Sequence, residues 1–137
     1  ESKFIVDHVK FSSMEQFMMY QKAITFQDQT IAKEILQIKD SAKIKLMGRQ
    51  VRNYNDHIWN GIRQIVVYEG LVAKFSQNEE LKKQLKETKT AILAECAVKD
   101  RIWGIGLSMK DLKRFDITQW RGQNLLGYAL MEVRKRL

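Results

Sequence analysis

The segment SSMEQFMMYQKA, residues 12–23, determines the expected architecture. Ser12 and Ser13 each precede a Glu or Gln by three residues, which is the spacing of a capping box, so a helix begins here and extends to about residue 26. On a helical wheel, methionine and phenylalanine flank Glu15 and Lys22 on one side, and a second apolar stripe lies opposite. A helix that is apolar on two sides is typical of the centre of a fold.

The rest of the chain predicts a mainly α fold with a few short β-strands. Residues 3–11 carry Phe, Ile and Val in loose alternation, which favours a short strand or hairpin. Further helices are expected at residues 31–39, at 42–47, after Asn55 or Asp56 with an interruption at Gly70, after Asn78, and after Asn124. Residues 90–98 favour a strand, and residues 99–123 read as a long loop, a kind of segment that often carries function.

Length and composition restrict the class of protein. The chain has 137 residues, of which 45% are hydrophobic and 29% are charged, and this balance indicates one globular domain over residues 1–137. Its apolar runs are too short for a membrane span, and the N-terminal residues show no signal peptide, so we expect a cytoplasmic protein with no membrane partner. The single cysteine, Cys96, excludes a disulfide framework and is expected to be buried. His8 and His57 lack metal-ligand spacing, and we expect neither a metal nor a cofactor.

The charge balance indicates an anionic partner. The chain carries 24 Lys and Arg against 16 Asp and Glu, a formal net charge of +8. A nucleic acid, a membrane surface and a phosphorylated small molecule all fit such a charge. The basic residues are spread along the chain and form no binding motif, which favours the small molecule over nucleic acid.

Glu15 and Lys22 are the most informative polar residues, because they interrupt an apolar stripe. A buried carboxylate or ammonium is costly unless it has a partner, and such groups acquire the shifted pKa values that mark sites. Two structural interpretations remain open. Glu15 could be the capping partner of Ser12, and Lys22 could extend its ammonium to solvent.

Other polar and small residues are weaker candidates. Arg49, after Gly48, could bind phosphate or cap carbonyl groups, and Glu95 and Asp100 could be site carboxylates or partners of basic residues. Trp103 could be a stacking platform or a core residue. The backbone N–H groups around Gly104 and Gly106 could bind an anion, although a lone Gly-x-Gly is a weak signal.

Six segments, taken together, resemble the YbiA-like or NADAR family of N-glycosidases. They are SSMEQFMMYQKA at 12–23, MGRQV at 47–51, the Trp59 helix, AKFSQNEEL at 73–81, LAECAVKDRIWGIGL at 93–107 and WRGQNLLGYALMEVR at 120–134. The resemblance extends from about residue 3 to residue 137. Family members usually carry an upstream segment with a Phe-Ser-Asn-like motif, which this sequence does not show.

The resemblance implies a mostly helical domain that cleaves the bond between ribose C1 and a nitrogen. Its members act on phosphorylated ribosylamine intermediates of riboflavin biosynthesis, or remove ADP-ribose from guanine in nucleic acid. Matched by motif, the implied catalytic residues are Glu15, Lys22 and Asp100. The implied substrate-binding residues are Arg49, Trp103, Gly104, Gly106 and Asn124, and Glu95 also matches a family position.

A Glu and Lys pair suits this chemistry. A neutral lysine can add to C1 of an opened ribosylamine and form an imine, while a carboxyl group moves protons. Direct attack by water, with Lys22 only positioning the substrate, is the alternative mechanism. Two other classes compete: a non-catalytic nucleotide or ADP-ribose binder, and a helical nucleic-acid-binding protein.

Overall fold

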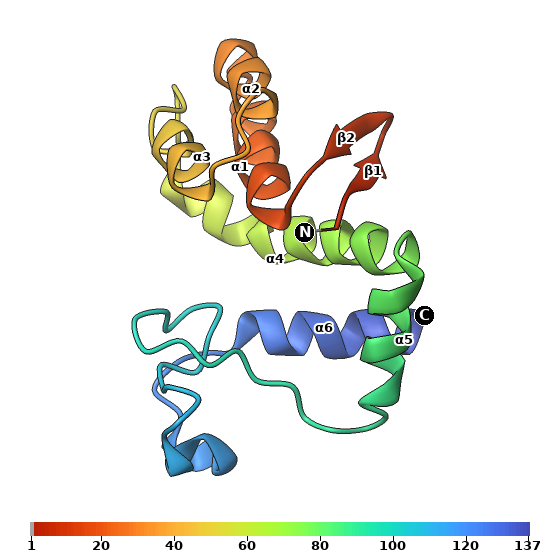
Figure 1. The fold of residues 1–137 in the computed structure, drawn as a ribbon. Helices are drawn as coiled ribbons and strands as arrows, with labels where there is room; N and C mark the ends of the chain where they lie inside the picture. The colour runs from red at the N-terminus through yellow and green to blue at the C-terminus, as the bar shows by residue number, and fades with distance from the viewer. Residues whose placement is uncertain (1) are drawn as a thin grey trace. The chain divides into compact units, whose positions relative to one another are not determined.

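A computed structural model describes residues 2–137, and the chain divides into two compact units that are treated separately below. The first unit extends to Lys82 and the second comprises Lys83–Leu137. Figure 1 shows the elements in order: β1 (Phe4–Val6), β2 (Val9–Phe11), α1 (Met14–Thr25), α2 (Gln29–Leu36), α3 (Ser41–Gly48), α4 (Asp56–Ser76), α5 (Glu79–Glu87) and α6 (Leu125–Arg136). Two short 3₁₀ helices, Leu112–Phe115 and Ile117–Gln119, precede α6. The expected mainly helical class with short strands is confirmed.

The first strands form the expected hairpin. β1 and β2 pair antiparallel, with Phe4 opposite Phe11. Asp7 and His8 connect them with φ angles of 49° and 69°, the left-handed conformation that a tight two-residue turn requires. Both phenylalanines are buried, so the hairpin contributes one apolar face to the first unit.

Helix α1 begins with a capping box that uses the second of the two possible spacings. The Ser13 hydroxyl accepts a hydrogen bond from the Gln16 N–H at 3.1 Å, and the Gln16 side chain accepts one from the Ser12 N–H at 2.8 Å. The same Gln16 amide donates to the carbonyl oxygens of Ile35 and Ile38 at 3.1 and 3.0 Å. Gln16 therefore ties the start of α1 to the end of α2.

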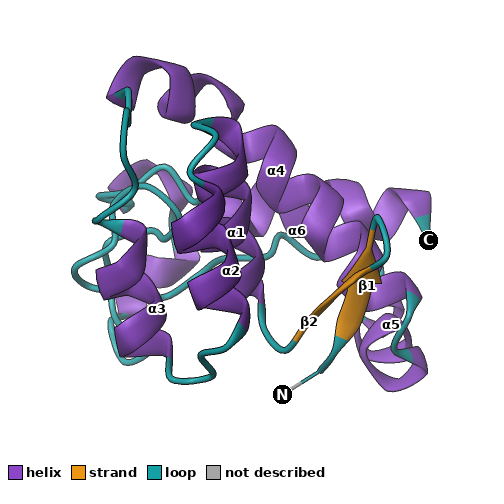
Figure 2. Ribbon diagram, turned by 90° about the horizontal axis from the view of Figure 1, so that it is seen from above, coloured by secondary structure: helices purple, strands orange, loops and turns teal. Residues whose placement is uncertain are grey.

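Helix α1 lies at the centre of the first unit, as its two apolar sides predict. It packs against α2, α3, α4 and β2 (Figure 2). One side joins a cluster of Phe4, Phe11 and Phe17, and the other joins a cluster that includes Phe26, Ile35, Ile44 and Trp59. Helix α3 approaches α1 so closely that a Cβ atom on Gly48 would collide with the sulfur of Met19.

Helix α4 is longer and more regular than expected. The Asn55 side chain caps it by accepting a hydrogen bond from the Ile58 N–H at 3.0 Å. The predicted interruption at Gly70 is wrong, because the helix continues to Ser76. Gly70 has another role: a Cβ atom there would lie 2.6 Å from the ring of Phe17, so the glycine lets the buried ring pack against the helix.

The second unit is held by hydrogen bonds between loops and α6. The predicted strand at residues 90–98 is wrong, since residues 91–97 have no regular secondary structure. Their main chain bonds instead to distant groups: the Asn124 side chain donates to the Leu93 carbonyl oxygen at 2.8 Å and accepts from the Glu95 N–H at 2.9 Å. The Glu95 carbonyl oxygen accepts from the Ile105 N–H at 2.9 Å.

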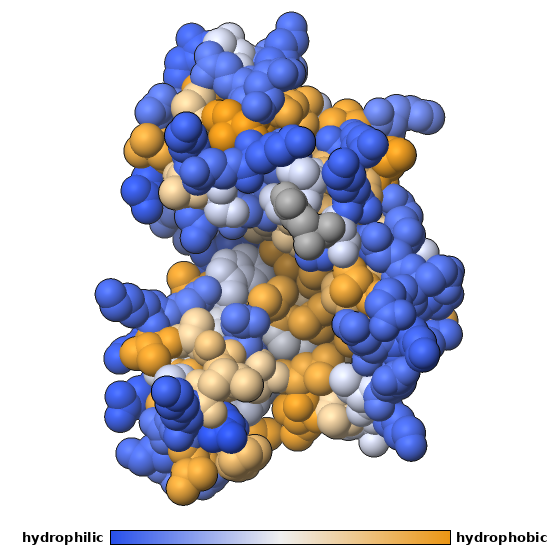
Figure 3. All heavy atoms as spheres, viewed as in Figure 1, coloured by the Kyte–Doolittle hydropathy of each residue, from blue (hydrophilic) through white to orange (hydrophobic). Residues whose placement is uncertain are grey.

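The helices of residues 2–137 include none with the length and apolar character needed to cross a lipid bilayer. Figure 3 shows hydrophilic side chains over much of the visible surface, with apolar atoms also reaching it. The exposed apolar residues of the second unit include Met109, Leu112 and Phe115.

Candidate functional site

One side of α1 carries the two most informative polar residues. Glu15 and Lys22 are half-buried, and the methionines beside them, Met18 and Met19, pack against the apolar cluster around Trp59. The two backbones are separated by about 10.5 Å along the helix axis, because each residue adds about 1.5 Å. Different charged groups act on the two side chains: Lys45 acts on Glu15, and Arg49 and Asp56 act on Lys22.

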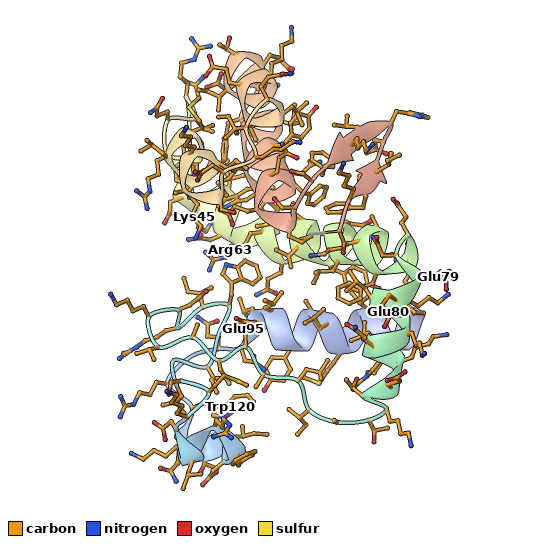
Figure 4. All side chains as sticks on the ribbon, viewed as in Figure 1. Lys45, Arg63, Glu79, Glu80, Glu95 and Trp120 are labelled. Carbon is orange, nitrogen blue, oxygen red and sulfur yellow. The ribbon has the colours of Figure 1, made fainter. Side chains whose placement is uncertain are left out.

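Glu15 occupies an environment that favours its protonated form. Burial raises the pKa of Glu15 above its ordinary value of 4.5, and the positive charge of Lys45, which projects from α3, opposes this increase (Figure 4). The capping hydrogen bonds of α1 are made by Ser13 and Gln16. The structural interpretation of Glu15 as the capping partner of Ser12 is therefore wrong.

Lys22 occupies an environment that favours its neutral form. Burial lowers the pKa of Lys22 below 10.5, and the positive charge of Arg49 lowers it further, while the carboxylate of Asp56 opposes both effects. The Lys22 ammonium lies over the ring of Tyr54, with Nζ 4.4 Å from the ring centroid. A lysine that loses its proton readily can act as a nucleophile.

Arg49 brings a second cation close to Lys22. It follows α3, where its backbone N–H donates to the carbonyl oxygens of the last helical turn. The capping is thus made by the main chain, and the exposed guanidinium forms no hydrogen bond or ion pair with the described residues 2–137. Its side chain is available to an anionic ligand.

Tyr54 and Asp56 lie beside Lys22, although neither was predicted as a site residue. The Tyr54 hydroxyl donates a hydrogen bond to Asp56 Oδ1 at 2.7 Å, and Asn60 Nδ2 donates to Asp56 Oδ2 at 3.2 Å. The Tyr54 ring also packs edge-on against Phe26, the residue that ends α1. The available signal was an aromatic residue beside Asn55, the cap of the next helix.

The other candidates lie in the second unit. Asp100 is engaged with its own loop, since its Oδ1 accepts from the backbone N–H groups of Ile102 and Trp103 at 3.0 and 2.8 Å. Trp103 is half-buried. The catalytic role of Asp100 and the stacking role of Trp103 stay predictions.

Gly104, Gly106 and Asn124 are closely packed within the second unit. A Cβ atom on Gly104 would lie 2.9 Å from the carbonyl oxygens of Glu95 and Asp100, and Gly106 has a φ angle of 73°. Asn124 precedes α6 as predicted, but it has a left-handed conformation and its side chain does not cap the helix. Their substrate contacts stay predictions, while their structural roles are evident.

The first turn of α6 is occupied by protein groups. The N–H groups of Asn124, Leu125 and Leu126 donate to the carbonyl oxygens of Gly104, Ile102 and Trp103 at 3.0–3.1 Å. A helix N-terminus whose N–H groups are already bonded is a poor anion site. The N–H groups of residues 124–126 are therefore not free to bind an anion.

Cys96 is half-buried, where full burial was expected. With Ile92, Met109, Phe115 and other residues of the second unit, it lines a mainly apolar cavity of about 340 Å³. Trp120, labelled with Glu95 in Figure 4, also lines it, and its indole N–H donates to the Arg114 carbonyl oxygen at 2.9 Å.

Comparison with known proteins identifies the family of this chain. The NADAR domain model matches residues 1–137. The chain is 40% identical to N-glycosidase R617 of Acanthamoeba polyphaga mimivirus, over 94% of this chain and 76% of the relative. It is 30% identical to N-glycosidase YbiA of Escherichia coli, over 96% of this chain and 74% of that protein.

A solved structure and a longer relative extend the comparison. The NMR structure of E. coli YbiA matches with a TM-score of 0.78 at 29% identity, and covers 98% of this chain and 71% of that one. A riboflavin biosynthesis protein of Vibrio vulnificus, VVA0006, is 31% identical over 86% of this chain but only 29% of its own length. The chain belongs to the NADAR family and groups with its N-glycosidase members.

Proposed function

We propose that the chain hydrolyses the bond between C1 of a phosphorylated ribose and an amine nitrogen, as in the early ribosylaminopyrimidines of riboflavin biosynthesis. The observation that supports this most directly is the pair of opposite pKa shifts on one helix: burial raises the pKa of Glu15 and lowers that of Lys22. A raised pKa makes a carboxyl group a better proton donor near neutral pH, and a lowered pKa makes an amine lose its proton more readily, which are the properties that acid catalysis and nucleophilic attack use.

The proposed reaction begins with opening of the sugar ring. Glu15 donates a proton to the ring oxygen, and the nitrogen lone pair forms a C1 iminium. The neutral amine of Lys22 then forms a bond to C1. A proton passes from the Lys22 nitrogen to the substrate nitrogen, the C1–N bond breaks, and the amine departs.

The remaining sugar is bound to Lys22 as an imine. Water adds to C1 after losing a proton to Glu15. The new hydroxyl proton then passes to the Lys22 nitrogen, the C1–N bond breaks, and C1 becomes the aldehyde carbon. The products are the free amine and the ribose phosphate, so the net reaction consumes one water. The exposed guanidinium of Arg49 holds the phosphate by charge-assisted hydrogen bonds.

Trapping of the imine tests the proposal. The protein is incubated with a riboflavin-pathway ribosylamine phosphate, and separately with ADP-ribosylated guanine DNA, in the presence of borohydride, and peptides are mapped by mass spectrometry. We expect a ribosyl adduct on Lys22 with the ribosylamine. An adduct that forms only with the DNA would show that the substrate is an ADP-ribosylated guanine instead.

The variant Lys22→Arg provides the matching control. It keeps the positive charge but cannot form the imine, so turnover should be abolished while binding remains. Full activity of Lys22→Arg would exclude the lysine mechanism and support direct attack by water. Binding of both ligands without turnover of either would support a non-catalytic module.

A further inference from the structure

Lys22 lies near the carboxylate of Asp56 but contacts the ring of Tyr54 instead of forming an ion pair. Lys22 is close enough to Asp56 for the carboxylate to raise its pKa. No ion pair joins the two residues within the described part of the chain, residues 2–137. The ammonium lies instead on the face of the Tyr54 ring.

The carboxylate of Asp56 is occupied by neutral donors. Tyr54 bonds one of its oxygens at 2.7 Å, and Asn60 bonds the other at 3.2 Å. Asp56 is also the first residue of α4, where the helix dipole stabilises a negative charge. The carboxylate is therefore satisfied without Lys22.

The Tyr54 ring is held in place from both ends. Its edge-on contact with Phe26 joins it to the end of α1, with ring centroids 5.2 Å apart, and its hydroxyl joins it to the start of α4. Burial, with the hydrogen bond to Asp56, raises the pKa of Tyr54 to about 12. The phenol thus remains a neutral donor over the physiological range.

We propose that Tyr54 is a positioning residue for Lys22, because its hydroxyl occupies Asp56 and its ring face receives the ammonium of Lys22. The inference rests on the proposed function, in which Lys22 must be able to lose its proton. A direct ion pair with Asp56 would hold the proton on Lys22, whereas the ring face provides a weaker contact.

The other charged groups around Lys22 shift its pKa in opposite directions. Arg49, from α3, favours the neutral amine, and Asp56, from α4, opposes it. Glu15 lies two turns away on α1, and Arg63, on α4, acts on Tyr54 rather than on Lys22. The expected consequence of releasing Asp56 is therefore a lysine that keeps its proton to higher pH.

The test is Tyr54→Phe, which keeps the ring and removes the hydroxyl. Competitive labelling with acetic anhydride over a pH series, followed by peptide mapping, measures the proportion of neutral Lys22 without any substrate. We expect about three- to tenfold slower labelling of Lys22 near neutral pH, the equivalent of half to one pKa unit. Tyr128→Phe, an exposed tyrosine of the second unit, is the matched control and should leave the labelling unchanged.

Asp56→Asn tests whether Tyr54 acts on Lys22 through the carboxylate of Asp56. In the Asp56→Asn background, adding Tyr54→Phe should cause no further change, because Tyr54 acts through the carboxylate. Unchanged labelling in Tyr54→Phe, or an equal effect in both backgrounds, would overturn the inference. If Tyr54→Phe folds poorly, Asp56→Asn alone must speed Lys22 labelling, and its failure to do so would overturn the inference equally.

Kinetics separate this inference from the proposed function. With the ribosylamine phosphate as substrate, Tyr54→Phe should lower kcat/KM at neutral pH, and kcat/KM should return to the wild-type value at higher pH. A purely structural role would not shift the pH profile in this way. Full activity in Lys22→Arg would refute the proposed function whatever Tyr54 does. An inactive Lys22→Arg with an unshifted Tyr54→Phe profile would refute only the positioning role.

Discussion

At the scale of single residues, the raised pKa of Glu15 implies a cost in stability. Because its pKa is raised in the folded protein, folding favours the protonated carboxyl. The ionised form therefore lowers the free energy of unfolding, and this cost is present above the folded pKa and disappears below the ordinary value of 4.5. A group kept under such conditions is typical of a functional site.

Glu15→Gln should slow turnover and stabilise the protein together. Loss of the acid–base group should reduce kcat by about 10²–10⁴. The melting temperature should exceed that of the wild type at neutral pH and match it below about pH 4.5, since the wild-type carboxyl is then protonated. Steady-state kinetics and thermal melts over a pH series measure both, and an unchanged kcat would remove Glu15 from the mechanism.

Arg49→Ala should weaken substrate binding. Loss of a charge-assisted hydrogen bond to phosphate corresponds to about 1.5–3 kcal/mol, or roughly a 10- to 150-fold increase in KM for the ribosylamine phosphate. The exposed Lys43 on α3, changed to Ala, removes an equal charge and should leave KM nearly unaltered. Similar effects of both substitutions would show that Arg49 contributes only general charge.

At the scale of elements, local signals predicted most of the first unit. The caps at Ser13 and Asn55, the hairpin and the central α1 all follow from spacing within a few residues. The strand predicted at residues 90–98 does not form, because the main-chain groups of Leu93 and Glu95 bond to the side chain of Asn124, about 30 residues away, rather than to a neighbouring strand. The Tyr54 contact with Lys22 was equally hidden, since it joins two elements through tertiary packing.

Two glycines of α4 should respond oppositely to the same substitution. Nothing lies within 4 Å of a Cβ atom at Gly61, so Gly61→Ala should raise the free energy of unfolding by about 0.5–1 kcal/mol through helix propensity. At Gly70 the Cβ atom would meet the buried Phe17 ring, and Gly70→Ala should lower that free energy by about 1–3 kcal/mol. Urea unfolding measures both, and a stabilising Gly70→Ala would show that Phe17 can move away.

Asn124→Ala should destabilise the second unit. The substitution leaves the Leu93 carbonyl and the Glu95 N–H without their present partner, at a cost of about 2–3 kcal/mol. The neighbouring exposed Gln123, changed to Ala, is the control and should cost little. Urea unfolding monitored by Trp fluorescence compares the variants, and a neutral Asn124→Ala with a raised KM would favour the predicted substrate contact instead.

At the scale of the whole molecule, the net charge of +8 attracts anions without selecting among them. Long-range attraction acts on any anion, whereas the proposed contacts with Lys22 and Arg49 would act at one place. Salt weakens the first contribution strongly, because the Debye length is about 10 Å at 0.1 M ionic strength. Salt dependence therefore measures how much of the binding comes from overall charge.

We expect kcat/KM for a ribosylamine phosphate to fall about tenfold between roughly 0.02 and 0.3 M salt, since attraction of the phosphate to a cationic protein is screened. The dephosphorylated ribosylamine should show almost no salt dependence, because it lacks the charge that is attracted. Duplex DNA added at low salt should compete only weakly, as the described basic residues form no continuous DNA-binding motif. Strong competition by DNA, with equal salt dependence for both ribosylamines, would instead assign the positive charge to nucleic-acid binding and make an ADP-ribosylated nucleic acid the better substrate.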